Sequence, residues 1–498
     1  MAFRQCPRRL WLEVHQPDLK EDSPATEAKF AVGDLVGELA RLLYDPEENG
    51  VLVKVMEEGP DAGVERTQVL LDKRVPIFEA GFESAGARAF IDILRPAKKS
   101  GQRCWELIEV KSSTSLKGNH RDDVAIQAYV AHQAQVNLSA VKVAHIDTSF
   151  IYKGQDQYDG LLREVDLTQE ALSRFDEVTD WVSDAQEIAT SEDMPTILTG
   201  MQCRSPHPCG FLKFCRTQEN PVAYPVDLLP RVQGELRRWM QAHQTRELSE
   251  VPDEKLSPLQ QRVKNCTLSN TLYFDPEGAQ NDINAAPLPH CFLDFEAVQL
   301  AVPIWPGTHP YQMFPFQFSL HVRRQDGELD HHEFMDLSGN EPSRAFAEAL
   351  VAACPEQGAI FVWNASFELT RLAVLAQQYG DLRKALSQIQ DRIVDLLKIV
   401  EKRYYHPGQR GSWKLKRVLP TLSSDLNHAH LDGVKDGYMA VLAYVEAIQP
   451  ETSPQRRAQI QQELFTYCRL DSLALVTIFN AMVGTIKTET SDISPCHV

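Results

Sequence analysis

The spacing of apolar and polar positions along the first part of the chain is typical of a mixed α/β module. Residues 1–45 repeat apolar side chains at helical spacing, as in RLWLEVH and FAVGDLVGELARLLY. Between 66 and 112 the pattern changes to short β-rich runs that are separated by turns. A helix is expected at 122–136 and a further strand at 140–150. We therefore predict an α/β core with a β-meander over residues 1–220.

A second series of strand and helix patterns begins at residue 290, after a polar and mixed stretch. Residues 290–298 form a near-continuous apolar run, which is typical of a buried strand. The further elements expected in this part are strands at 314–323 and 359–366 and helices at 342–354, 368–379 and 463–483. The pattern thus predicts a helical connector at 221–285 and a second α/β domain at 286–498.

The composition is that of a globular protein with more than one domain. The chain has 498 residues, of which 43% are hydrophobic and 24% charged, and this length exceeds one ordinary domain. No apolar run approaches the roughly 20 residues that cross a bilayer, and the start has no signal-peptide pattern. A cytoplasmic location is therefore expected. The net charge of −18 argues against a general nucleic-acid coat protein, but it leaves a nuclease open.

Cysteine spacing indicates a metal centre. In a reducing compartment the ten cysteines are not expected to form disulfides. Cys203, Cys209 and Cys215 lie in CRSPHPCGFLKFC, and Cys6 lies near the start of the same module. Four thiolates suit zinc or an iron–sulfur cluster, which spacing alone does not separate, and ordinary buried cysteines are the alternative. The remaining six are interpreted as core or incidental residues, for example Cys104, Cys266 and Cys468.

A first group of polar residues lies within two apolar strand patterns. Asp92 lies in AFIDIL, and Glu109 and Lys111 lie in WELIEVK. Residues i and i+2 of a strand face the same side, so Glu109 and Lys111 project together and Asp92 can join them from the neighbouring strand. Two carboxylates can hold Mg²⁺ or Mn²⁺, and the lysine can stabilise phosphate charge. Gln127 on the following helix is positioned to orient this site, and a solvated strand edge is the alternative.

Together with the four cysteines, this pattern resembles the RecB-like PD-(D/E)XK nucleases that carry an iron–sulfur cluster. Examples are the CRISPR-associated RecB-like exonucleases and the AddB-type helicase–nuclease subunits. The resemblance covers about residues 1–220 and implies a restriction-endonuclease-type fold, metal on Asp92 and Glu109, and a catalytic Lys111. It also implies a structural 4Fe–4S cluster whose ligands are Cys6, Cys203, Cys209 and Cys215.

Two positions depart from that resemblance. Relatives often carry a histidine metal ligand on the early helix, where this chain has Gly37 followed by Glu38. Glu38 is a candidate substitute ligand, and an exposed helical glutamate is the alternative. Relatives also tend to have a tyrosine four residues after the glutamine, whereas this chain has Ala131 there and a tyrosine at Tyr129.

A second group of acids lies in the C-terminal domain. HCFLDFEAV places Asp294 and Glu296 on one face of an expected buried strand, where two acids require a metal or a partner. Glu368 begins the helix after FVWNAS, and Tyr467 and Asp471 share a helix face at i and i+4. Four carboxylates can bind two divalent ions for an in-line displacement, and the tyrosine can position water. Capping and surface acids are the alternative.

This second group resembles the DEDD exonucleases of the RNase H-like, proofreading-domain type, over about residues 286–490. Tyr467-x-x-x-Asp471 matches the tyrosine variant of their last motif, and the resemblance implies a structural role for Asp395. Glu368, after Asn364, stands where these enzymes usually have aspartate. The whole chain also resembles a bacterial family of unknown function that fuses the two modules, in which NASFE is the usual form.

A segment between the last two motifs combines basic and aromatic residues. This pattern suits contact with a nucleic-acid backbone and stacking on bases, and a solvated loop is the alternative. The residues concerned are Lys402, Arg403, Lys414, Lys416 and Arg417, with Tyr404, Tyr405 and Trp413.

The expectation from sequence is a nuclease that uses Mg²⁺ or Mn²⁺ and acts on DNA rather than RNA, in DNA repair or defence. The C-terminal domain is expected to be a 3′–5′ exonuclease and the N-terminal module a RecB-like nuclease, with a helicase or defence-system partner left open. Two alternatives also stay open: a nucleic-acid-binding scaffold with degenerate sites, and an RNA-processing exonuclease.

Overall fold

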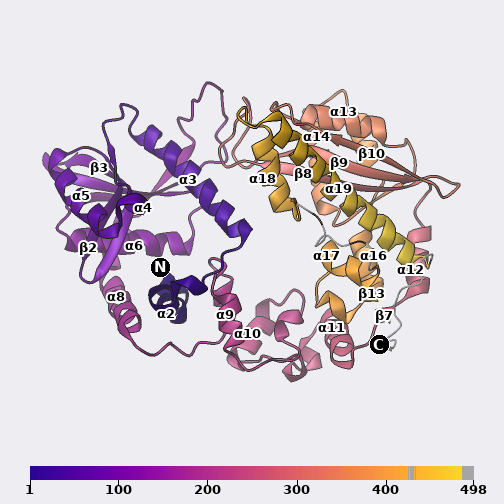
Figure 1. Cartoon of the computed structure of the whole chain (residues 1–498), viewed down its shortest axis with the longest axis horizontal. Coiled ribbons are helices and arrows are strands. Elements are labelled where there is room, and N and C mark those ends of the chain that lie inside the picture. The colour runs from indigo at the N-terminus through magenta and orange to yellow at the C-terminus, as the bar shows by residue number, and fades with distance from the viewer. Residues whose placement is uncertain (424–425, 427–430, 432, 485–498) are drawn as a thin grey trace. The chain divides into compact units, whose positions relative to one another are not determined.

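The chain divides into two compact units of mixed α/β structure (Figure 1). A computed structural model describes residues 1–423, 426, 431 and 433–484, so 485–498 of the expected second domain lie outside the described residues. One unit comprises Met1–Asn220 and Leu300–Gln312, and the other comprises Pro221–Gln299 and the residues from Met313 onward. Residues 221–285, expected as a connector, thus belong to the second unit. None of the described helices is long and apolar enough to span a membrane.

The first unit is built on one six-stranded mixed sheet in sequential strand order. The strands are β1 (Val51–Leu52), β2 (Ile77–Ser84), β3 (Ala87–Lys99), β4 (Gln102–Lys111), β5 (Leu138–Ile146) and β6 (Leu162–Asp166). The helices are α1 (Ala2–Gln5), α2 (Pro7–His15), α3 (Pro24–Tyr44), α4 (Val55–Glu58), α5 (Pro60–Lys73), α6 (Gly118–Gln133), α7 (Thr168–Ser173), α8 (Phe175–Thr190) and α9 (Leu212–Thr217). The meander β2–β3–β4 is antiparallel, and α6 crosses over to β5, which is parallel to β4.

The helical patterns of residues 1–45 and 122–136 are confirmed, but the expected β-rich run is wrong at its beginning. Residues 66–73 belong to α5, which starts at Pro60. Thr67 and Leu70 are buried at positions i and i+3, whereas Val69 is 62% exposed. This three-residue spacing buries one face of a helix, and a strand would have buried alternate residues instead.

The second unit is built on a five-stranded mixed sheet in the order β10-β9-β8-β11-β12. Its strands are β8 (His290–Gln299), β9 (Met313–Arg323), β10 (Leu329–Met335), β11 (Ala359–Val362) and β12 (Ile393–Asp395), and β7 (Tyr273–Phe274) and β13 (Tyr404–Tyr405) form a separate two-stranded sheet. The helices are α10 (Gly234–Ala242), α11 (Pro258–Ser269), α12 (Pro276–Asn284), α13 (Ser343–Ala353), α14 (Ser366–Gln378), α15 (Arg383–Gln390), α16 (Leu396–Arg403), α17 (Leu415–Val418), α18 (Gly437–Ala447) and α19 (Pro454–Met482).

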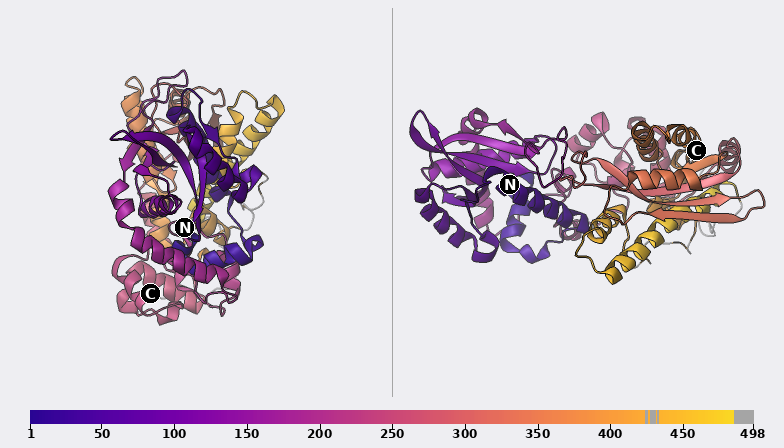
Figure 2. Two further views of the ribbon diagram at one scale, coloured as in Figure 1. Left: turned by 90° about the vertical axis from the view of Figure 1, so that its left-hand side faces the viewer. Right: turned by 90° about the horizontal axis from the view of Figure 1, so that it is seen from above.

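The central strand β8 is buried on both faces, and its alternation decides which residues meet α19. Leu293 and Phe295 pack with Phe346 of α13 in one core cluster. Phe292 packs with Phe479 of α19 in another cluster. Because side chains alternate along a strand, Asp294 and Glu296 share the face of Phe292 and meet α19. Figure 2 shows α19, in yellow, along one face of the sheet.

Truncation of a central ring should destabilise the second unit. Phe361 of β11 is fully buried between Phe292 and Phe479, with ring centroids 5.7 and 5.1 Å away. We expect Phe361→Ala to lower the free energy of unfolding by about 3–5 kcal/mol, because it leaves a cavity. Urea denaturation measures this loss. Val374→Ala, at a position 38% exposed, is the control, and equal midpoints for the two variants would contradict the packing described.

Candidate functional site

Three carboxylates of the second unit converge on one point. Oxygen atoms of Asp294, Glu296 and Asp471 all lie within 4.8 Å of one another. The first two come from alternate positions of β8, and the third comes from α19, which packs on the same face of the sheet. Oxygen ligands at this spacing suit a divalent cation such as Mg²⁺ or Mn²⁺.

Burial makes this carboxylate trio electrostatically costly without a cation. Burial raises the pKa of Asp294 well above its ordinary value, and Asp471 and Glu296 raise it further. Burial likewise raises the pKa of Glu296 to about 8, with a further rise from Asp471 and an opposing effect of Lys416. Like charges at short range disfavour ionisation, whereas a bound cation reverses that effect.

Glu368 lies beside the trio but outside it. It is in the first turn of α14 and only 3% exposed, and its buried Oε2 atom has no hydrogen-bond partner among the described residues. Burial raises its pKa to about 8, and Asp395 raises it further. Glu368 in turn raises the pKa of Asp294. An orphaned buried carboxylate oxygen next to three other acids fits a second cation position.

Asp395 has a structural contact at the end of β12. Its Oδ1 accepts a hydrogen bond of 3.2 Å from the backbone N–H of Asn364, which has a φ of +70°. Asparagine tolerates this left-handed conformation better than most residues. Asp395 thus supports the turn that leads into α14 and Glu368.

Tyr467 and Lys416 border the trio. The phenol of Tyr467 hydrogen-bonds Asp471, and burial, followed by that carboxylate, raises its pKa. The Nζ atom of Lys416 lies 5.1 Å from the centroid of the Tyr467 ring and donates to the carbonyl of Lys435. The site therefore combines acids that can hold a divalent cation with a phenol and an ammonium group that can contact an anionic ligand.

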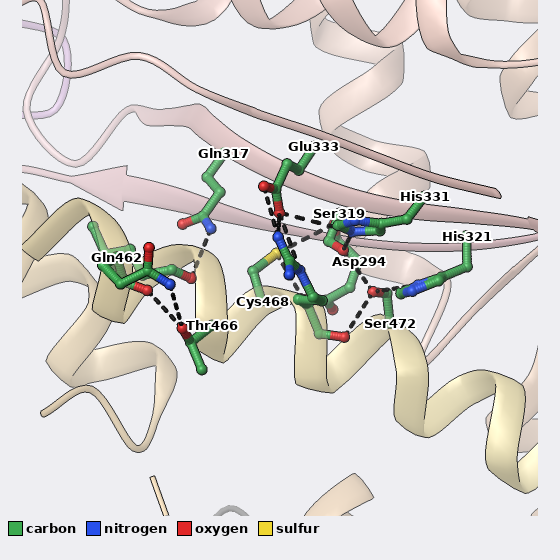
Figure 3. Close-up of polar contacts among 12 residues, drawn as sticks. Asp294, Gln317, Ser319, His321, His331, Glu333, Gln462, Thr466, Cys468 and Ser472 are labelled. Atoms are coloured by element: carbon green, nitrogen blue, oxygen red, sulfur yellow. Dashed lines mark hydrogen bonds and ion pairs between the residues drawn. The ribbon is translucent and has the colours of Figure 1, made fainter. Parts of the chain in front are cut away.

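A polar network ties α19 to the sheet next to the trio (Figure 3). Cys468 is a core residue, as expected, and its Sγ atom also donates to Asp294 Oδ2 over 3.5 Å. On the same helix, Ser472 Oγ is 2.7 Å from Ser319 Oγ and 3.0 Å from His321 Nδ1. Ser319 is also 2.8 Å from Nε2 of His331 on the edge strand β10. These bonds fix the rotation of α19 and with it the direction of Asp471.

The basic and aromatic segment does not offer its rings to bases, so the stacking interpretation is wrong for these residues. Tyr404 and Tyr405 are fully buried, and Trp413 is 7% exposed. They pack in the core of the second unit, where β13 pairs with β7. Arg403 forms ion pairs with acids of that unit, including one of 2.8 Å to Asp282. Of this segment, Lys416 is the residue that borders the trio.

The predicted residues of the first unit also lie together. The Oδ2 atom of Asp92 accepts from the Val110 backbone N–H over 2.6 Å. Lys111 Nζ is 2.5 Å from Glu109 Oε1 and 2.8 Å from Asp123 Oδ2. Burial raises the pKa of Asp92 to about 6, and Lys111 opposes that rise. Burial also raises the pKa of Glu109 well above its ordinary value.

The sequence interpretation missed two acids of this first site. Asp123 precedes Gln127 by one helical turn, and Gln127 Nε2 donates to Glu109 Oε2 over 2.8 Å. Glu79 interrupts the β2–β3 ladder opposite Asp92, with a φ of +55° that a non-glycine residue rarely adopts inside a strand. Burial raises its pKa, and Glu109 raises it further. The sequence signal that could have indicated Glu79 is that it is a single acid in the apolar run IFEAGF.

The two departures from the RecB-like resemblance have structural counterparts. The Glu38 side chain is 66% exposed and lies 3.9 Å from Arg41, as expected for a surface glutamate. Tyr129 is buried in the core of the first unit and packs edge-on against Phe175.

The four cysteines predicted to hold a metal centre, Cys6, Cys203, Cys209 and Cys215, line one pocket. Cys6 precedes α2, and the other three lie in η2 (Met201–Cys203), before α9 and within α9. Burial raises the pKa of Cys215 to about 11 and neighbouring thiols add to this, while Arg8 opposes it. Arg8 also lines the pocket, and within the part of the chain that the structure describes its buried Nε atom has no hydrogen-bond partner. This is an environment in which thiolates require a positive centre.

A family model described as a domain of unknown function (DUF2779) matches residues 291–414. This range contains Asp294, Glu296 and Glu368. It ends at Lys414, before Lys416 and Asp471. None of the curated proteins compared matches the chain.

The stability of the metal-free second unit should fall as pH rises. The native pKa of Glu296, about 8, exceeds its ordinary value of 4.5, so the folded state binds more protons between these values. The free energy of unfolding therefore decreases across that range and changes little above it. Glu296→Gln should reduce this dependence and raise the melting temperature at pH 8 by at least about 2 °C.

Thermal melts from pH 5 to pH 8, with chelator and with Mn²⁺, test this expectation. Mn²⁺ should stabilise the unmodified protein and should stabilise Glu296→Gln much less. Glu356→Gln, at an exposed carboxylate, is the control. The same pH dependence in both variants would contradict the assigned electrostatics.

Proposed function

We propose that this protein is a metal-dependent nuclease that hydrolyses phosphodiester bonds, with DNA as the favoured substrate. The observation that carries the proposal is the carboxylate trio Asp294, Glu296 and Asp471 with the orphaned Glu368 beside it. This donor set fits two divalent ions, which stabilise the attacking and leaving oxygens when bound. We assign the second unit an RNase H-like fold with 3′–5′ exonuclease activity.

The residues of the chain divide the work at this site. The acids would hold the divalent cations, and Cys468 orients Asp294 through its hydrogen bond. Tyr467, held by Asp471, can orient the attacking water. Lys416, next to Tyr467, can supply an ammonium group for the phosphate.

For the first unit we propose a RecB-like nuclease site of the PD-(D/E)XK type. Asp92 and Glu109 supply carboxylates, with Glu79 close by, and they can hold one divalent ion. Lys111, kept protonated beside Glu109 and Asp123, can stabilise charge on the phosphate. Gln127 keeps Glu109 in place.

For the cysteine pocket we propose a 4Fe–4S cluster with a structural role. The four thiols belong to the described residues, and no three of their sulfur atoms form a group within 4.8 Å. Around zinc, with Zn–S distances of about 2.3 Å, sulfurs lie about 3.8 Å apart. The wider spacing favours a larger cluster, and the cationic Arg8 suits its net negative charge. Such a cluster fits a reducing compartment, and we propose a cytoplasmic location.

Digestion of end-labelled nucleic acids with Mn²⁺ tests the nuclease proposal. We expect the unmodified protein to shorten single-stranded DNA from its 3′ end and Asp294→Asn to lose this activity at least about 100-fold, because the trio no longer holds a cation. Lys111→Ala should retain it. RNA of the same sequence and double-stranded DNA complete the substrate set.

The outcomes separate the alternatives. Binding of DNA without cleavage by the unmodified protein would leave a scaffold with degenerate sites. Preference for RNA would replace the substrate assignment. Loss of all cleavage in Lys111→Ala alone would remove the exonuclease role from the second unit.

Iron analysis tests the cluster. Anaerobically purified protein should be brown and hold about four iron atoms per chain, and Cys209→Ser should lower iron content and thermal stability because one thiolate ligand is lost. Cys104→Ser, at a buried cysteine outside the pocket, is the control. Stoichiometric zinc and a colourless protein would replace the cluster by a zinc site.

A further inference from the structure

A segment between β8 and β9 is an integral part of the first unit. Residues Leu300–Gln312 follow the strand of Asp294 in sequence but belong to the compact unit of residues 1–220. Ala301 and Val302 are 6% and 8% exposed and pack in an apolar cluster with Val36 of α3. Tyr311 and Val110 of β4 pack against the same cluster.

Hydrogen bonds hold this segment along its length. The Gly307 N–H donates to the Tyr152 carbonyl over 2.7 Å, and the Tyr152 N–H donates to Thr308 over 3.0 Å. His309 Nδ1 lies 2.9 Å from the Phe150 carbonyl. Ordering thirteen residues costs conformational entropy, which such contacts must offset. The segment is therefore an ordered part of the first unit.

The contact of Tyr311 lies next to the first carboxylate site. Its phenol donates to the carbonyl of Ser112, the residue that directly follows Lys111. The ladder between β3 and β4 ends at Ile108, so among the described residues Glu109 to Lys111 pair with a strand only on the β5 side. On the β3 side, Asp92 takes the place of a backbone partner by accepting from Val110. Tyr311 therefore anchors a strand end that the sheet holds on one side only.

We propose that Tyr311 is a positioning residue for the first carboxylate site. It fixes the end of β4 so that Lys111 Nζ stays between Glu109 and Asp123. The activity part of this inference rests on the proposed nuclease function, whereas the positioning part does not. A displacement of about 1 Å at a reacting group can lower a rate about 100-fold, so one backbone contact is sufficient to matter.

Chemical labelling of Lys111 tests the positioning without reference to catalysis. The full-length protein is treated with acetic anhydride, and acetylation at each lysine is followed by mass spectrometry. We expect Tyr311→Phe, which keeps the ring but loses the phenol, to raise the labelling rate of Lys111 several-fold. Tyr158→Phe is the matched control, because it removes a 3.2 Å bond to Pro303 of the same segment. It should leave the Lys111 rate unchanged.

Kinetics in an Asp294→Asn background isolate the first site. Tyr311→Phe should lower kcat about 10- to 100-fold with KM unchanged, and Tyr158→Phe should leave kcat unchanged, with similar melting temperatures for both. If the parent cleaves nothing, the nuclease proposal for this site fails, while the labelling result still decides the role of Tyr311. An unchanged Lys111 rate in Tyr311→Phe, or an equal rise in Tyr158→Phe, would overturn the inference.

Discussion

Repulsion between buried carboxylates is the constraint on which the second unit depends. Asp294, Glu296 and Asp471 bring oxygen atoms within 4.8 Å, in a setting where burial already disfavours their charge. Moving charge into a medium of low polarity without a partner is costly, and a sequence that keeps three such acids together sacrifices stability in the metal-free protein. Such a cost is typical of a functional site.

The rest of the fold brings these acids together and keeps them there. The alternation of β8 places aromatic side chains against α13 on one face and against α19 on the other. The acids occupy two positions of the α19 face, so the helix must present its own acid at the right height and rotation. The network of Ser472 with Ser319 and His321 determines that rotation, and Cys468 determines the direction of Asp294.

The first unit arranges its acids by a different device. Its carboxylates lie where a ladder is interrupted, with Glu79 in a strained conformation and Asp92 bonded to the backbone of Val110. Open strand ends allow polar side chains to converge, but they are held less firmly than the centre of a sheet. The contact of Tyr311 with Ser112 compensates for this, and it comes from a segment that follows β8.

The amino-acid sequence by itself determined those features that depend on local periodicity. The positions of β4, β8, α6 and α19 follow from strand-like apolar runs or helical spacing, and the pairs Asp294–Glu296 and Tyr467–Asp471 follow from the i, i+2 and i, i+4 rules. Only the tertiary structure decided what depends on distant parts of the chain meeting. It buried Tyr404 and Trp413 in a core, placed Cys468 and Lys416 at the trio, and assigned residues 300–312 to the first unit. The physical reason is that periodicity shows which face of an element is apolar, whereas packing alone selects the partner of that face.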